Sequence, residues 1–530
     1  MTEKQIVFLS GNEAIAQGAW EAGCHVASAY PGTPSSEILE EISKYDEIDS
    51  QWAVNEKVAY EVAFGACTAG ARSLYASKHV GVNVAMDPLM TSAYIGVNGG
   101  FVVITADDPG IHSSQNEQDN RYIAKFAKMP LLEPASPREA KEYVGLAFKL
   151  SEDFDIPVIL RMTTRISHSK QDVELDKRYE VPFKKYSNNV QKNVMVPKNA
   201  YARHIDLEKR MSALKEYSNK TELNKIEIND KKIGIITSGV GYLYAKEAYP
   251  DASYLKLGMS YPFPDKKANE FASMVDELYV IEELEPFIEE ELKILGLKPK
   301  VKDASFKIGE LRPELIPYII NQEKKPEDKT GPSRKPSLCK GCPHDRVFNA
   351  IKKYVPTVTG DIGCYTLGAL PPLASLHTCV CMGASITTME GFKKVLKEKV
   401  VAVIGDSTFI HTGVAGLINA AYNGAKGIVF ILDNSTTAMT GSQPHPAVGI
   451  NIKGEKTKKL ILEDLCKACG VDSVDVVNPV KEGEKLESLI QQRLSENKLS
   501  VIITRFPCII ANRKMAKLEK EKEAKDNECK

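Results

Sequence analysis

The chain has 530 residues, which is too long for one hydrophobic core and predicts about three domains. Its 69 Lys and Arg residues nearly balance its 70 Asp and Glu residues, so the formal net charge is −1 and no basic field points to a nucleic-acid partner. No apolar run reaches membrane-spanning length and no signal peptide precedes the first strand-like segment, so we expect a cytoplasmic protein without a membrane partner.

Residues 1–180 are predicted to form an α/β domain with a doubly wound sheet. Apolar strand-like runs alternate there with helical patterns, as in IVFLS, NEAIAQGAWEAG and VASAYPGTPSSEILEEI. The turn 30–35, which contains Thr33, is expected to open a helix. It is either an anion site at free backbone N–H groups or a plain set of Ser and Thr caps.

Two further stretches of this domain carry candidate functional residues. Glu56 precedes a helix of small residues, YEVAFGACTAGA, where a carboxylate is either a cap on a solvated face or part of a site. The loop 107–121 is long and polar and carries His112 and Arg121, as binding loops do.

The rest of the chain divides by composition. Residues 181–230 are highly charged with weak periodicity, and we expect a linker or covering segment there. Residues 231–320 again alternate strands and helices, as a second α/β domain does. A Lys-, Glu- and Pro-rich linker is expected at 321–337, then a third α/β domain at 338–512 and a charged tail at 513–530.

Two short apolar strands in the third domain, 401–404 and 428–432, each end in a polar turn, with a helix predicted between them. Ligands bind at the carboxyl ends of parallel strands, so Asp406 and Asn434 are placed where a phosphate and its metal would lie. With the backbone carbonyl of Thr436 they make an oxygen set that suits Mg²⁺ bound to a diphosphate. The alternative is an ordinary βαβ turn in which Asp and Asn cap helices.

Eleven cysteines are spread unevenly along a chain expected to be cytoplasmic, which argues against a disulfide framework and favours metal or redox use. The close pairs are CKGC at Cys339 and Cys342, CVC at Cys379 and Cys381, and CKAC at Cys466 and Cys469. The last pair lies in a helix-like segment and is expected to pack as small hydrophobes.

A series of motifs follows in order along residues 5–512. They are YPGTPSSE, NEKVAYEVAFGA, DDPGIHSSQNEQDNR, VIEELEP, LCKGCPH, GDIGCYTLG, CMGASI, GDSTFIHTG and DNSTTAMTGSQPHP. Together they resemble the large, alpha subunits of the indolepyruvate:ferredoxin oxidoreductase family, within the thiamine diphosphate-dependent 2-oxoacid:ferredoxin oxidoreductase superfamily. The resemblance implies a pyrimidine-binding domain first, a transketolase-C-like α/β domain in the middle and a diphosphate-binding domain third.

The resemblance also implies roles for single residues. Glu56 would hydrogen-bond the aminopyrimidine ring of thiamine diphosphate, and Thr33 would face the substrate carboxylate or the cofactor. Arg121, His112 and His79 are candidates for carboxylate contacts. The expected contacts to the diphosphate and its Mg²⁺ come from Gly383, Gly405, Asp406, Ser407, Asn434 and Thr436, with Asp406, Asn434 and Thr436 as the metal ligands.

One four-iron (4Fe-4S) cluster is a further group that the resemblance implies. Its ligands would be Cys339, Cys342, Cys364 and Cys508. The alternatives are a tight turn with buried thiols and a zinc site made by the same residues.

The implied reaction is the oxidative decarboxylation of arylpyruvates of the indolepyruvate type to aryl-acetyl-CoA, with electrons leaving singly to ferredoxin. A smaller beta subunit and coenzyme A would take part. Members of the family usually continue into a ferredoxin-like domain with two Cys-rich runs, whereas this chain stops at Lys530, so we expect those clusters to be truncated or carried by another chain. Two alternatives remain open, a non-oxidative thiamine-dependent decarboxylase and an inactive cofactor-binding or scaffold subunit.

Overall fold

The computed structural model describes residues 5–327 and 337–513. Contacts group the chain into two compact units, residues 1–329 and 330–530. The predicted linker at 321–337 lies partly outside the described residues, and the predicted tail at 513–530, with Cys529, lies there almost entirely. The first unit contains both of the α/β domains predicted within residues 1–320, and each has a sheet of its own.

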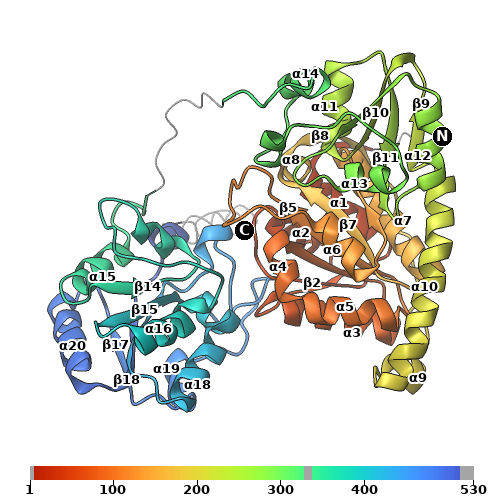
Figure 1. Ribbon diagram of the computed structural model, residues 1–530. Helices are drawn as coiled ribbons and strands as arrows, with labels where there is room; N and C mark the ends of the chain where they lie inside the picture. Colours follow the sequence, from red (N-terminus) through yellow and green to blue (C-terminus); the bar gives the residue numbers. More distant parts are fainter. Residues whose placement is uncertain (1–4, 328–336, 514–530) are drawn as a thin grey trace, which may run out of the picture. The chain divides into compact units, whose positions relative to one another are not determined.

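A seven-stranded sheet in the order β12-β6-β7-β5-β4-β2-β3 is the centre of the first domain (Figure 1). Its strands are β12 (Met259–Tyr261), β6 (Leu131–Leu132), β7 (Val158–Thr163), β5 (Phe101–Asp107), β4 (Ser73–Lys78), β2 (Val26–Ala29) and β3 (Asp49–Trp52). All neighbouring strands are parallel except β12 and β6. Strands β4, β5 and β7 are buried throughout, as parallel strands covered by helices on both faces are.

Two groups of helices pack on this sheet. One group is α1 (Gly11–Glu21), α2 (Ser36–Ile42) and α7 (Pro137–Phe154), and the other is α3 (Glu56–Ala69), α4 (His79–Val84), α5 (Met86–Ile95) and α6 (Asn120–Ala127). Side-chain caps set where several of them begin. Asn55 caps α3 by accepting a hydrogen bond from the backbone N–H of Val58 at 2.9 Å. The doubly wound α/β fold predicted for this region is confirmed.

The strand order of this sheet reverses at β2. From β2 the chain passes to β3 on one side, and the next strand, β4, pairs with β2 on the other side. Such a reversal opens a crevice outside the carboxyl ends of the strands, and ligands of doubly wound sheets bind there. The turn that contains Thr33 and the end of β4 at Lys78 border this crevice.

A four-stranded sheet ordered β13-β10-β11-β9 forms the second domain of the first unit. Its strands are β13 (Glu277–Ile281), β10 (Asp230–Ser238), β11 (Ala252–Leu257) and β9 (Asn224–Glu227), of which β9 is antiparallel to its neighbour. Helices α11 (Val240–Ala248), α12 (Asp265–Ser273) and α13 (Phe287–Ile294) accompany it. The chain leaves β11 for β12, which pairs with β6 of the first sheet, so the two domains are joined by strand pairing.

The segment predicted as a linker or covering segment, 181–230, contains a 24-residue helix, α10 (Pro197–Lys220). Figure 1 shows it as a long yellow helix, and it contacts α5, α12 and β12. Its buried side chains, Leu207, Met211, Leu214 and Ser218, lie on one stripe at helical spacing. The helix was missed because this stripe is narrow and most of the other residues are charged or polar. Just before this segment, β8 (Lys170–Glu174) pairs with β1 (Ile6–Ser10) in a separate two-stranded sheet.

The second unit has a five-stranded parallel sheet ordered β14-β15-β16-β18-β17. Its strands are β14 (Thr357–Thr359), β15 (Val400–Gly405), β16 (Gly427–Asp433), β18 (Leu499–Arg505) and β17 (Ser473–Val477), and its main helices are α15 (Pro343–Lys352), α16 (Ala384–Val395), α18 (Val414–Tyr422), α19 (Leu462–Ala468) and α20 (Gly483–Glu496). Alternate strand residues enter two separate cores. Val401 and Val403 pack with α15 and α20, whereas Ala402 and Ile404 pack with α16, α18 and α19.

The predicted crossover between the two polar strand ends is present but irregular. A short helix α17 (Asp406–Thr408) leads into a π-helical turn, Phe409–Gly413, before α18 begins. Such turns are rare and often lie at functional sites. The remaining short elements are α8 (Thr164–His168), α9 (Val190–Asn193), α14 (Ile316–Ile320) and the 3₁₀ turns Ala304–Lys307, Pro313–Leu315, Cys364–Ala369 and Ala438–Thr440.

None of the helices within residues 5–327 and 337–513 is both long enough and apolar enough to cross a membrane.

Candidate functional site

Asp406 lies at the carboxyl end of β15, at the centre of a group of hydrogen bonds. Its side chain is buried, and its Oδ1 accepts from the backbone N–H of Ser407 at 2.9 Å. Its Oδ2 accepts from the backbone N–H of Ser435 at 2.8 Å and lies 3.2 Å from Nε2 of His445. Because Ser435 follows β16, this carboxylate ties together the ends of two neighbouring strands.

The turn after β16 supplies the other predicted metal ligands. Asn434 Oδ1 accepts from the backbone N–H of Thr436 at 3.1 Å, which holds the turn closed. Asp433 also lies here, and its Oδ2 accepts from Nε of Arg505 at 2.6 Å. The structure therefore brings Asp406 and the 434–436 turn together at one edge of the sheet, where parallel α/β sheets bind ligands.

His445 is a neighbour of this group that the sequence analysis did not single out. Burial works against ionisation of Asp406, but the hydrogen bond and charge of His445, with the amides of Ser407 and Ser435, hold the pKa of Asp406 below its ordinary value. The Nδ1 atom of His445 is buried and has no hydrogen-bond partner among the described residues. Its position in the quoted QPHP run was the signal available in the sequence.

The pKa of Asp433 is shifted in the opposite direction from that of Asp406. Burial and the nearby charge of Asp406 raise the pKa of Asp433, although Arg505 opposes them. Two carboxylates thus share one buried strand edge, and only Asp433 has an arginine partner. A divalent cation at Asp406 would offset this concentration of negative charge.

Gly405 and Ser407, also predicted to contact the diphosphate, flank Asp406. A Cβ atom on Gly405 would lie 2.7 Å from Cε1 of Tyr365, so no side chain fits at that position. The hydroxyl of Thr437 lies 2.9 Å from Oγ of Ser407, which joins the two strand-end turns a second time. These contacts keep both turns closely packed around the candidate site.

Gly383 immediately precedes α16, with φ of 87°. Its backbone N–H donates to Oδ1 of Asp361 at 2.8 Å, and the N–H of Ser385 donates to Oδ2 of the same residue at 2.9 Å. A Cβ atom on Gly383 would lie 2.0 Å from Oγ1 of Thr412. Glycine is therefore needed here for packing and for the backbone conformation, and its N–H is already used by Asp361.

Asp361 is a second buried carboxylate near this sheet edge. Burial raises the pKa of Asp361 to about 6, against the effect of the amides of Ser385, Ile362 and Gly383. It belongs to the GDIGCYTLG motif, but the sequence analysis assigned it no role.

The four predicted cluster ligands, Cys339, Cys342, Cys364 and Cys508, line one cavity of about 90 Å³. Burial, with a contribution from the neighbouring thiols, raises the pKa of Cys342 and of Cys364 to about 11. Such thiols stay neutral unless a cation stabilises the thiolates. Nevertheless, no three His, Cys, Asp or Glu side chains converge as a metal site anywhere in the described part of the chain. The donor type therefore fits an iron–sulfur cluster, while the positions of the sulfur atoms do not form its ligand set.

In the first unit, Glu56 is the first residue of α3 and its side chain is buried, so it does not lie on a solvated face. Asn55, not Glu56, provides the side-chain cap. A Cβ atom on Gly81 would lie 2.6 Å from Oε1 of Glu56. The close approach of α4 to the side chain of Glu56 therefore requires glycine at position 81. Thr33 lies in the turn after β2, and Glu56 follows β3, the strand that pairs with β2. Both residues therefore lie near the carboxyl ends of parallel strands in one sheet.

Arg121, by contrast, is engaged entirely by protein groups. It is 1% exposed, its Nη1 donates to Glu282 at 2.7 Å, and it binds both carboxylate oxygens of Asp119. Its Nη2 also donates to the carbonyl oxygens of Glu283 and Glu285, at 2.8 and 2.9 Å. This geometry favours a structural role of Arg121 between the two domains of the first unit, and its predicted contact with a substrate carboxylate stays a prediction.

We expect Arg121→Met to lower the free energy of unfolding of the first unit by about 3–5 kcal/mol, because Asp119 and Glu282 would stay buried without their cation. Urea unfolding followed by intrinsic fluorescence measures this. The matched control is Arg165→Met, whose side chain is 51% exposed and pairs with Glu310, and which should cost about 1 kcal/mol or less. Equal losses in the two variants would contradict the assignment.

The two histidines proposed for carboxylate contacts lie in different surroundings. His112 is exposed on its loop, with Nε2 3.3 Å from Oε2 of Glu310. His79 is buried at the start of α4, and its Nε2 lies 3.2 Å from the carbonyl oxygen of Asn116. Burial lowers the pKa of His79, which favours its neutral form.

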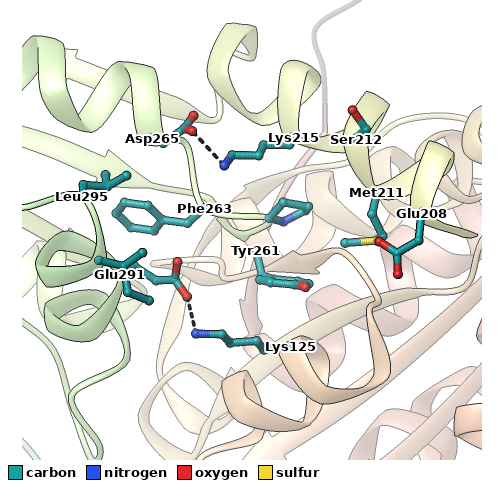
Figure 2. A pocket seen from close by; sticks show the side chains of 12 residues that line it. Lys125, Glu208, Met211, Ser212, Lys215, Tyr261, Phe263, Asp265, Glu291 and Leu295 are labelled. Carbon is teal, nitrogen blue, oxygen red and sulfur yellow. Dashed lines mark hydrogen bonds and ion pairs between the residues drawn. The ribbon is translucent and has the colours of Figure 1, made fainter.

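A cavity of about 440 Å³ lies elsewhere in the first unit. Figure 2 shows its aromatic floor at Tyr261 and Phe263, between α10, α12 and α13. Its lysines are already paired, Lys125 with Glu291 at 2.5 Å and Lys215 with Asp265 at 2.7 Å. None of the residues predicted from the motifs lines it.

Comparison with known proteins gives two family matches. The model described as "Thiamine pyrophosphate enzyme, C-terminal TPP binding domain" matches residues 361–504, which hold the Asp406 group. The model described as "Pyruvate flavodoxin/ferredoxin oxidoreductase, thiamine diP-bdg" matches residues 17–233, which hold Thr33 and Glu56.

Several relatives that match over nearly the whole chain carry the name indolepyruvate oxidoreductase subunit IorA. The chain is 42% identical to that of Archaeoglobus fulgidus, over 96% of this chain and 87% of the relative. It is 40% identical to that of Methanothermobacter marburgensis, over 95% of this chain and 87% of the relative. Among solved structures, a 2-oxoglutarate:ferredoxin oxidoreductase from Magnetococcus marinus matches with a TM-score of 0.52 and 16% identity, over 61% of this chain and 66% of that chain, which shows a shared fold.

Proposed function

The chain belongs to the indolepyruvate oxidoreductase IorA family of thiamine diphosphate-dependent 2-oxoacid:ferredoxin oxidoreductases, and from this we propose that it carries out the oxidative decarboxylation of arylpyruvates of the indolepyruvate type. The family resemblance predicted from the motifs is thereby confirmed, as is the α/β fold class. We further propose that the product is the aryl-acetyl-CoA, that ferredoxin accepts the electrons, and that a smaller beta subunit completes a cytoplasmic enzyme.

The observation that carries this proposal is the joining of two strand ends by Asp406. Its Oδ2 accepts from the N–H of Ser435 at 2.8 Å, one residue beyond Asn434. Asp406 and Asn434 would hold Mg²⁺ through side-chain oxygens and Thr436 through its carbonyl, with the diphosphate completing the coordination. The Nδ1 atom of His445, next to Asp406, is buried and has no hydrogen-bond partner among the described residues. A polar group of the bound cofactor would satisfy this atom, which also supports the proposal.

Thiamine diphosphate, when bound, supplies the carbon nucleophile and the electron sink that decarboxylation of a 2-oxoacid needs. Gly405 and Ser407 would border the diphosphate, and Gly383 would support that site through its packing against Thr412. Glu56, buried in the first unit, would hydrogen-bond N1′ of the aminopyrimidine and hold a proton there. Thr33 would face the substrate.

The cysteine cavity is proposed as the place of one four-iron cluster. What supports this is the chemistry of the donors, four thiols at one cavity, with two of them needing a cation to ionise. The sulfur atoms would have to approach one another more closely than they do here, so no step of the reaction is assigned to this group.

The proposed function is tested with the chain purified together with its beta subunit, thiamine diphosphate and Mg²⁺. Indolepyruvate and coenzyme A should reduce a viologen dye under anaerobic conditions. No reduction by a sample that binds thiamine diphosphate in a calorimeter would refute the oxidative reaction. Iron and sulfide analysis of the same sample separates the alternatives, because a preparation without iron that releases CO₂ from indolepyruvate and does not reduce the dye would favour non-oxidative decarboxylation.

A further inference from the structure

Lys78 is the last residue of β4 and lies at the crevice where the strand order of the first sheet reverses. A Cβ atom on Gly32 would lie 3.1 Å from Cβ of Lys78, so the turn that contains Thr33 runs directly against the lysine stem. Gly81, three residues after Lys78, lies against the carboxylate of Glu56. Lys78 therefore contacts the turn that contains Thr33 and lies three residues before a glycine that packs against Glu56.

The ammonium group of Lys78 is buried without a full set of acceptors. Lys78 is 8% exposed, and its Nζ donates to the carbonyl oxygen of Ser113. An ammonium has three N–H donors, and no other acceptor is found for it among the residues that the structure describes. Buried charges are normally paired, and this one is not.

Asp108, the carboxylate whose charge acts on Lys78, is occupied by other donors. It accepts from Ser113 N at 2.8 Å, from Ser114 Oγ at 2.6 Å and from Thr164 Oγ1 at 2.7 Å. Burial lowers the pKa of Lys78 to about 8, and the charge of Asp108 only partly opposes this. An anion at the crevice would supply the acceptors and the charge that the protein does not.

We propose that Lys78 binds the carboxylate of the 2-oxoacid substrate, an inference that rests on the proposed function. The substrate carboxylate suits this position because it is the one anionic group of an arylpyruvate, whose keto group and aromatic ring are neutral, so a single buried cation beside the turn of Thr33 matches it. The diphosphate is assigned to Asp406 and its neighbours, and the buried guanidinium of Arg121 already donates to Asp119, Glu282 and Glu283. Lys78 is thus the cation that binds the substrate at the carboxyl ends of the strands of the first sheet.

The test measures discrimination between an acid and its neutral analogue. Indole-3-propionate and indole-3-propionamide are titrated by calorimetry into the full chain with its beta subunit, loaded with thiamine diphosphate and Mg²⁺. The wild type should prefer the carboxylate. Lys78→Met should weaken carboxylate binding by roughly 10- to 100-fold, the loss of a charge-assisted hydrogen bond, and change amide binding by less than about threefold.

Two variants keep the result interpretable. Lys78→Arg should retain a preference for the carboxylate, and Lys44→Met, at an exposed lysine paired with Glu41, should behave as wild type. Equal weakening of both ligands in Lys78→Met would show a structural role and overturn the inference, as would unchanged discrimination. If the wild type turns over indolepyruvate and only the discrimination result fails, the proposed function stands. If the wild type shows neither turnover nor cofactor binding, both fall.

Discussion

Asp406→Ala is expected to abolish Mg²⁺-dependent binding of thiamine diphosphate, with a loss of affinity of at least about 100-fold. The variant removes the one carboxylate that joins the ends of β15 and β16, and with it the proposed anionic metal ligand. Calorimetric titration of the cofactor in the presence and absence of Mg²⁺ measures the effect. Unchanged affinity in the presence of Mg²⁺ would remove Asp406 from the site.

A second substitution separates metal binding from folding. Asp406→Asn keeps one of the two oxygens that accept from the N–H groups of Ser407 and Ser435, so the turn should be destabilised less than in Asp406→Ala while the metal-binding charge is lost. Asp464→Ala, at an exposed carboxylate of the same unit, is the matched control and should bind the cofactor as wild type does. A thermal unfolding curve of each variant shows which losses come from unfolding.

Glu56→Gln is expected to lower turnover by about 100-fold or more while changing the affinity for thiamine diphosphate by less than about tenfold. The substitution keeps the size and a hydrogen-bonding group at a buried position, but it removes the carboxyl group that can hold a proton at N1′ of the aminopyrimidine. The direct measurement is the exchange of the cofactor C2 proton for deuterium in quenched samples. Normal exchange and normal turnover would contradict the role.

The control for this variant lies on the same helix. Glu61→Gln removes a half-exposed carboxylate that pairs with Lys57, about one turn further along α3. It should leave both exchange and turnover unchanged. If the two variants behaved alike, the effect of Glu56→Gln would be one of helix stability, since a carboxylate in the first turn contributes about 0.3–1 kcal/mol there.

The sheets were predictable because their strands are short apolar runs that end in polar turns. This pattern located Asp406 and Asn434 correctly at the ends of neighbouring strands, since parallel strands place their carboxyl ends at one edge. The ordered motifs pointed to Thr33 and Glu56, which follow two neighbouring parallel strands, β2 and β3, of the first sheet. Their roles in catalysis remain predictions.

Other features depend on contacts that a linear pattern does not contain. His445 reaches Asp406 only because the chain folds back 39 residues later, and Lys78 becomes a buried cation only through its neighbours. Arg121 resembled a binding residue because it lies in a polar loop, but its partners Glu282 and Glu283 come from the second domain of the first unit. The helix α10 escaped detection because only a narrow stripe of it is buried.

The antiparallel pairing of β12 with β6 limits how the first unit could be cut or recombined. Residues 131–132 and 259–261 lie far apart in the sequence and are adjacent in one sheet. A chimera that exchanged residues 231–320 for those of a relative would therefore also exchange an edge strand of the first sheet and Glu282, one of the two carboxylates that pair with Arg121. The natural module for grafting is thus the whole first unit, residues 1–329, and substrate preference could be transferred between relatives only with both sheets together.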